Sequence, residues 1–217
     1  MAVTRTGPLR GVLAVALLSG ALAIPAEAHP HVWITFETTV VYDKGTFVGV
    51  KHKWTFDEFY TAMAIEGLDK NKDGIYDREE LAELAKVNIE GLKDFSFFTF
   101  PALAGKEIKV GEARDYWLEH KDGALSLIFT LPFANPVLEE AKGLTVSVYD
   151  PTYFIAFELA KTDPAKLSEG APKGCAAKVG VPAQQQGKGA PLEGLQAQLG
   201  ALGVSISKTI LVECNAP

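Results

Sequence analysis

Two neighbouring stretches of alternating side chains constrain the fold of this chain most. Residues 32–42 and 47–56 are rich in β-branched and aromatic residues, and they flank a turn sequence at residues 43–45. This pattern is typical of two antiparallel strands joined by a tight turn. Alternation in the second stretch places His52 on its apolar side. We therefore expect a β-hairpin with one buried face.

Further short strands are predicted after this hairpin, separated by Gly, Pro or Asp turns. They cover residues 93–100, 107–120, 124–131, 144–149, 153–159 and 205–212. Before them, residues 57–92 have the pattern of two helices. Asp57 can cap the first helix, and Leu81 and Val87 fall on the buried side of the second. The prediction is an α+β fold: a β-rich antiparallel sheet or sandwich domain with an inserted helix-loop-helix, EF-hand-like element at 57–92.

The residues between the two predicted helices have the spacing of a calcium-binding EF-hand loop. Oxygen-bearing side chains recur at alternate positions around a glycine, which allows a sharp bend around a hard cation. The expected ligands are Asp69, Asn71, Asp73, Ile75 through its carbonyl, Asp77 and Glu80. The eighth position, usually aliphatic and paired with a second loop, is Tyr76, and no second loop follows in the sequence. We expect a structural calcium site of modest affinity, with a solvated acidic turn as the alternative.

The four histidines form a second candidate site. They are His29, His31, His52 and His120. An extended backbone would place the first two on one side, and the other two lie on apolar strand faces. If these imidazoles converge, they suit a transition metal (zinc, nickel, cobalt or copper). The alternative is that the interior histidines are hydrogen-bonded core residues and that the first two fray.

The start of the sequence predicts a cleavable signal peptide over residues 1–28. Arg5 and Arg10 precede an apolar run at 12–23 that is too short to span a bilayer, and small residues stand at the expected cleavage site. Cleavage would make His29 the amino terminus, and its free amine could join a metal site. We expect a periplasmic protein with no membrane insertion after cleavage.

Composition limits the partners of the remaining domain, residues 29–217. The chain has 21 Lys plus Arg against 27 Asp plus Glu, a net charge of −6, which disfavours nucleic acid as a partner. Cys175 and Cys214 are the two cysteines, and an oxidising compartment favours a disulfide between them. Residues 162–203 are rich in Ala, Gly, Pro and Gln and are expected to form a low-complexity loop held by this disulfide.

Four segments resemble those of DUF1007, a family of uncharacterised exported bacterial proteins. They are residues 29–34, 54–58, 69–80 and 149–153. The resemblance implies the periplasmic component of an ABC-type transport system, associated with nickel, cobalt or zinc transport. Asp150 in the last segment is expected to end a strand at an Asp-Pro turn, with a ligand role as the less favoured alternative.

Together these features favour a periplasmic protein that captures a transition metal or delivers it to a membrane metal transporter, with calcium as a structural ion. One alternative is an adaptor that docks on the transporter without binding metal. Another is a copper enzyme with a histidine brace. The sequence has no nucleophile elbow, phosphate loop or paired redox cysteines, so we expect no enzyme activity.

Overall fold

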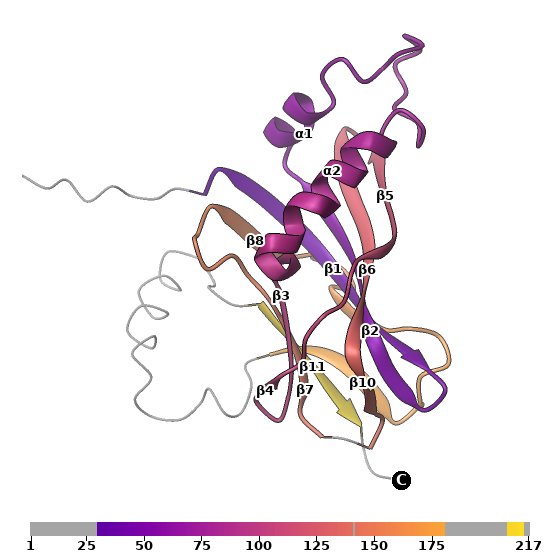
Figure 1. Cartoon of the computed structure of the whole chain (residues 1–217), viewed down its shortest axis with the longest axis vertical. Coiled ribbons are helices and arrows are strands. Elements are labelled where there is room, and N and C mark those ends of the chain that lie inside the picture. Colours follow the sequence, from indigo (N-terminus) through magenta and orange to yellow (C-terminus); the bar gives the residue numbers. More distant parts are fainter. Residues whose placement is uncertain (1–29, 141, 181–207, 215–217) are drawn as a thin grey trace, which may run out of the picture.

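Two β-sheets dominate the computed structural model, which describes residues 30–140, 142–180 and 208–214 (Figure 1). Within these ranges, the first sheet has the order β5-β6-β2-β1-β8, with β9 also paired to β1. The second has the order β10-β11-β7-β3-β4. The first sheet consists of β1 (Val32–Asp43), β2 (Thr46–Phe56), β5 (Arg114–Lys121), β6 (Ala124–Leu138), β8 (Ile155–Leu159) and β9 (Ala165–Leu167). The second consists of β3 (Thr99–Leu103), β4 (Lys106–Glu107), β7 (Leu144–Val148), β10 (Cys175–Gly180) and β11 (Lys208–Cys214).

The predicted amino-terminal hairpin is confirmed. β1 and β2 pair antiparallel, with Val40 opposite Val50. Lys44 and Gly45 in the turn both have positive φ, as a two-residue hairpin turn with the twist of the flanking strands requires. The expectation of a wholly antiparallel sheet is wrong, because β8 and β9 both run parallel to β1.

The main core lies between the sheets and under the helices. It is formed by alternate residues of each strand, as the period of two requires. The first sheet contributes Phe36, Trp54 and Phe129, and the second contributes Val146 and Ile210, all almost fully buried. The prediction of a β-rich fold is therefore confirmed, and its strands form two sheets rather than one.

Two helices lie beside β5 and β6 at the upper end of the view (Figure 1). Helix α1 (Glu58–Ala64) is capped by Asp57, whose Oδ1 accepts a hydrogen bond from Tyr60 N at 2.9 Å. Helix α2 (Ala82–Leu92) buries Ala85 and Ile89. Leu81 is 1% exposed, as predicted, but Val87 is 56% exposed, so only part of the predicted buried face of this helix is confirmed.

The segment after α2 differs from the predicted strand at 93–100. It forms a 3₁₀ turn, η1 (Lys93–Phe98), and β3 begins only at Thr99. Ser96, Phe97 and Phe98 have φ between 46° and 52°, in the left-handed region. This turn buries Phe97 and Phe98. In the sequence, a short apolar run of this kind cannot be distinguished from a buried strand.

The expected loop at 162–203 contains two strands, β9 and β10, in its described part. The predicted disulfide between Cys175 and Cys214 is confirmed, and it joins the first residue of β10 to the last residue of β11. It therefore lies at the end of this strand pair away from the long connection. The expected signal peptide, His29 and the rest of that loop lie outside the described residues. Over the described ranges, no helix is long and apolar enough to cross a membrane.

Candidate functional site

The acidic loop at residues 69–80 is organised by its own side chains. Asp69 accepts hydrogen bonds from Asp73 N at 3.2 Å and Gly74 N at 3.0 Å. Asn71 accepts a second bond from Asp73 N at 2.9 Å, and Asp73 accepts one from Ile75 N at 2.7 Å. Gly74 has a φ of +79°, a conformation that L side chains rarely adopt. The side chains predicted to be ligands thus stabilise the turn, because their oxygens accept hydrogen bonds from backbone N–H groups.

Glu80 closes this loop from its last position. Its Oε1 accepts from Lys70 N at 2.8 Å, and its Oε2 accepts from Asp77 N at 3.3 Å. Asp77 Oδ1 in turn accepts from Glu80 N at 2.9 Å. This reciprocal pair has the pattern of a capping box, and it lies at the turn just before α2. Glu80 is only 8% exposed, so the loop's two ends are tied together by a buried carboxylate.

The loop also contacts the edge strand β5. The ring of Tyr76 lies edge-to-face on His120, with centroids 5.0 Å apart. The guanidinium of Arg78 lies 4.4 Å from the ring centroid of Trp117, and Lys51 Nζ lies 5.1 Å from the same ring. The acidic loop is therefore connected to the sheet through two of its own side chains.

His52 is fully buried, and both of its ring nitrogens have hydrogen-bond partners. Nε2 lies 3.2 Å from Thr99 Oγ1, and Nδ1 lies 2.9 Å from Thr38 Oγ1. Thr99 donates its single hydroxyl proton to Phe97 O at 2.7 Å, so Nε2 must donate to Thr99 and Nδ1 must accept from Thr38. Burial lowers the pKa of His52 from 6.5 to about 3. The ring is a neutral core group without a lone pair free for a metal.

The structure does not bring the predicted histidine ligands together. His52 is opposite Phe129 and His120 is opposite Leu125 on β6. Both side chains point to the inner face of the sheet, but β2 and β5 lie on opposite sides of β6, and the two partner residues on β6 are four residues apart. The two histidines are therefore about 16 Å apart. His31 is exposed at the start of β1, three strands from β5. In residues 30–140, 142–180 and 208–214, no group of three or more His, Cys, Asp or Glu side chains is placed to hold a metal ion.

Three of the segments noted in the sequence meet at the amino-terminal end of β1. His31 N donates to Phe154 O at 2.8 Å, just ahead of β8. Trp33 N donates to Asp57 Oδ2 at 2.9 Å, and Asp57 N donates to Trp33 O at 3.0 Å. Burial alone would raise the pKa of Asp57, but hydrogen bonds from backbone N–H groups, first that of Trp33, lower it. Asp57 therefore joins this end of β1 to helix α1.

Asp150 organises the third of these segments. It is 5% exposed and accepts from Thr152 N at 2.7 Å, Thr152 Oγ1 at 2.7 Å and Ile155 N at 2.9 Å. These partners lie in the turn that leads into β8 and at the first residue of that strand. The geometry supports the role in a strand-ending turn that the sequence favoured.

An exposed aromatic group lies at this end of the sheet, and it includes Phe154, which the sequence did not single out. The ring of Phe154 packs on His31 with centroids 4.8 Å apart, and Trp33 lies two residues further along β1 on the same face. Trp33 is 47% exposed and Phe154 is 52% exposed. Alternation could have located Trp33, because it faces away from the buried neighbour Ile34.

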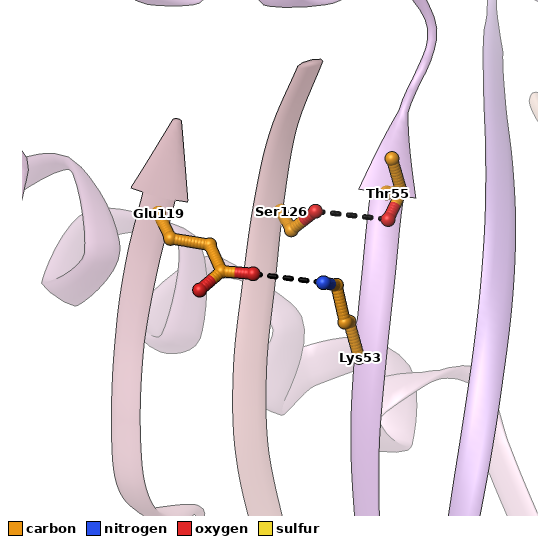
Figure 2. A network of polar contacts seen from close by, with 4 residues as sticks. All are labelled: Lys53, Thr55, Glu119 and Ser126. Carbon is orange, nitrogen blue, oxygen red and sulfur yellow. Dashed lines mark hydrogen bonds and ion pairs between the residues drawn. The ribbon is translucent and has the colours of Figure 1, made fainter. Parts of the chain in front are cut away.

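The outer face of the first sheet also carries polar contacts between strands. Figure 2 shows Glu119 of β5 reaching across β6 to Lys53 of β2, with an N–O distance of 2.8 Å. Beside this ion pair, the hydroxyl groups of Thr55 and Ser126 are 2.8 Å apart. Both charged side chains are partly exposed, so the pair contributes little to stability. Together, the ion pair and the hydroxyl contact join side chains of β5, β6 and β2.

Fold and site together define a class: a disulfide-linked, two-sheet β protein with a helical insert that carries an acidic loop. The chain belongs to the DUF1007 family of proteins of unknown function, which it matches over residues 14–214.

Two relatives are uncharacterised. The chain is 25% identical to an uncharacterized protein of Haemophilus influenzae over 192 residues, which cover 87% of this chain and 92% of that protein. It is 29% identical to an uncharacterized 15.5 kDa protein in the trpE 3′ region of Spirochaeta aurantia over 99 residues, covering 46% of this chain and 70% of that protein.

Proposed function

We propose that this protein is an exported divalent-metal-binding protein whose loop at residues 69–80 binds calcium. One observation carries the proposal. The side chains of Asp69, Asn71, Asp73 and Glu80 already hold the loop backbone in a closed turn through hydrogen bonds to its N–H groups. An ordered turn lowers the conformational entropy cost of collecting ligands around an ion.

The donor set fits a hard cation. Calcium takes oxygen ligands, and the loop offers four carboxylates, the Asn71 amide oxygen and the Ile75 carbonyl. The carboxylates repel one another, and Lys70, Lys72 and Arg78 offset only part of that charge. A bound calcium ion would supply the missing positive charge, so binding would stabilise the insert.

Thermal melting with calcium or EDTA tests this proposal. For a dissociation constant of about 10⁻⁴ to 10⁻³ M, 10 mM calcium should stabilise the protein by roughly 1.4 to 2.7 kcal/mol. That is an increase in Tm of about 3 to 10 °C for a domain of this size. Asp69→Asn should abolish the increase, whereas Asp94→Asn, which changes an exposed acid outside the loop, should keep it. Equal melting of the wild type in calcium and EDTA would contradict the proposal.

Transition-metal capture for a membrane transporter is the second part of the proposed function, and the geometry narrows its ligands. His52 is buried with both nitrogens in use, whereas the His31 ring is exposed at the start of β1. Capture would then depend on His31 together with His29 and its amine. Zinc, nickel, cobalt and copper competition should compare protein starting at His29, the same protein with one extra amino-terminal residue, and His31→Ala. Equal binding by all three would rule out this site.

A role as a transporter adaptor without bound transition metal is favoured by a different observation. Trp33 and Phe154 expose aromatic surface next to each other, and buried Asp150 and the cap Asp57 hold their backbones in place. Exposed aromatic clusters are typical of docking surfaces. In this case, Trp33→Ser would weaken transporter binding, whereas removing transition metals with a chelator would leave binding intact.

A further inference from the structure

We propose that the edge strand β5 completes the calcium loop by taking the position that a second loop has in paired EF-hands. This inference rests on the proposed calcium site and names two further residues that position it, His120 and Trp117. Neither is expected to touch the ion.

The first contact comes from the eighth loop position. In paired hands this residue meets its counterpart in a second loop, but here Tyr76 meets His120 of β5, with ring centroids 5.0 Å apart and an interplanar angle of 74°. Edge-to-face packing at this distance is a favourable aromatic geometry. Tyr76 and His120 are both half-buried, so the contact also removes ring surface from water.

The second contact lies on the other face of the same strand. Arg78, the tenth loop residue, stacks on Trp117 at 4.4 Å, and Lys51 of β2 approaches the same ring. Trp117 is opposite Ile128, which is only 4% exposed although it lies outside the main core. The Trp117 ring therefore covers an apolar side chain on the outer face of the sheet, and the guanidinium of Arg78 stacks on the same ring.

The two contacts hold the loop on both sides of one strand. Trp117 and His120 are three residues apart on β5, an odd spacing that puts their side chains on opposite faces. A loop held in this way has fewer conformations before it binds calcium, so less entropy is lost on binding. His120 thus acts through Tyr76, as an aromatic support rather than as a metal ligand.

Calcium titration calorimetry on matched variants tests the role of β5. Arg78→Ala and Lys70→Ala each remove one positive charge from the loop, so long-range electrostatics should strengthen calcium binding about equally in both. Only Arg78→Ala also removes the contact with Trp117, and the energy of a cation–π contact predicts roughly two- to fivefold weaker binding than for Lys70→Ala.

The aromatic contact has its own matched pair. His120→Ala should weaken calcium binding roughly two- to fivefold, in line with the energy of an aromatic pair. His120→Phe should restore it, because a phenyl ring keeps the edge-to-face contact but cannot bind a metal. If His120→Phe binds calcium as poorly as His120→Ala, the proposed aromatic role is overturned.

Hydrogen exchange of the wild-type protein provides a test that needs no substitution. Calcium should slow exchange in peptides covering β5 (Arg114–Lys121), while β8 (Ile155–Leu159), the opposite edge of the same sheet, should be unchanged. If the wild type binds calcium but β5 exchanges at the same rate with and without it, β5 does not complete the loop. Matching affinities for Arg78→Ala and Lys70→Ala would overturn the inference in the same way. A wild type that binds no calcium would remove both the proposed site and this inference.

Discussion

Lowering the pH from 7 to 5 is expected to destabilise the folded protein because His52 cannot take up a proton in the core. In the unfolded chain this histidine titrates near 6.5, whereas burial lowers its pKa in the folded state to about 3. Between these values the unfolded state binds more protons, so stability falls as the pH falls. The stability that neutral His52 contributes is fully retained above its pKa in the unfolded state. It is progressively lost as the pH falls toward its pKa in the folded state.

The size of the effect follows from that difference in pKa. Each unit below 6.5 costs about 1.4 kcal/mol until the folded pKa is reached, so His52 alone should remove about 2 kcal/mol at pH 5 and about 4 kcal/mol at pH 3. Thr38 and Thr99 do not prevent this loss. A protonated ring would need to donate from both nitrogens, but Nδ1 faces a hydroxyl that now donates to it.

Urea denaturation of wild type and His52→Gln at pH 7 and pH 5, both in EDTA, isolates this contribution. Carboxylates titrate in both proteins and cancel in the comparison. His52→Gln should be less stable at pH 7 because its fit in the core is worse, yet its loss between pH 7 and 5 should be about 2 kcal/mol smaller. Equal losses in the two proteins would refute the argument that His52 is held neutral.

Three substitutions and one treatment test other parts of the fold. Asp57→Ala removes the helix cap and the acceptor for Trp33 N, and should cost about 1 to 2 kcal/mol in urea denaturation; an unchanged midpoint would contradict this role. Gly49→Ala would place a Cβ 2.3 Å from the Leu131 carbonyl oxygen and should cost roughly 1 to 3 kcal/mol. Gly91→Ala, on an open helix surface, should instead gain up to about 1 kcal/mol. Reducing the disulfide, whose cysteines are 39 residues apart, should cost about 3 to 4 kcal/mol, so oxidised and reduced protein should not melt together.

Local patterns in the sequence were sufficient for the hairpin and the loop turn. Alternation indicates which face the β1 and β2 residues occupy, except near the register shifts at Val41/Tyr42 and Phe47/Gly49, and residues 43–45 indicate how the chain reverses. Asp57 was recognised as a cap because its type and position suit the start of a helix. These features depend on neighbours within a few residues, which is the information that a single sequence carries.

Features that depend on distant pairing were not predictable in this way. Alternation correctly put His52 and His120 on one face of the sheet. It does not determine their positions along the strand direction, and the pairing register with β6 separates them. The same limit applies to β8, since nothing local says that it lies parallel to β1. The left-handed turn at Ser96 has no Gly or Asn to indicate it.

The position of the disulfide has a consequence for the integrity of the molecule after proteolysis. β11 lies between β10 and β7 in the second sheet, and it supplies the buried side chains of Ile210 and Val212. A protease that cuts the chain anywhere between residues 181 and 207 would leave this strand covalently attached through Cys175 and Cys214. The nicked protein would remain one covalent molecule until the disulfide is reduced. The chain can therefore be cut in that interval without releasing its last core strand.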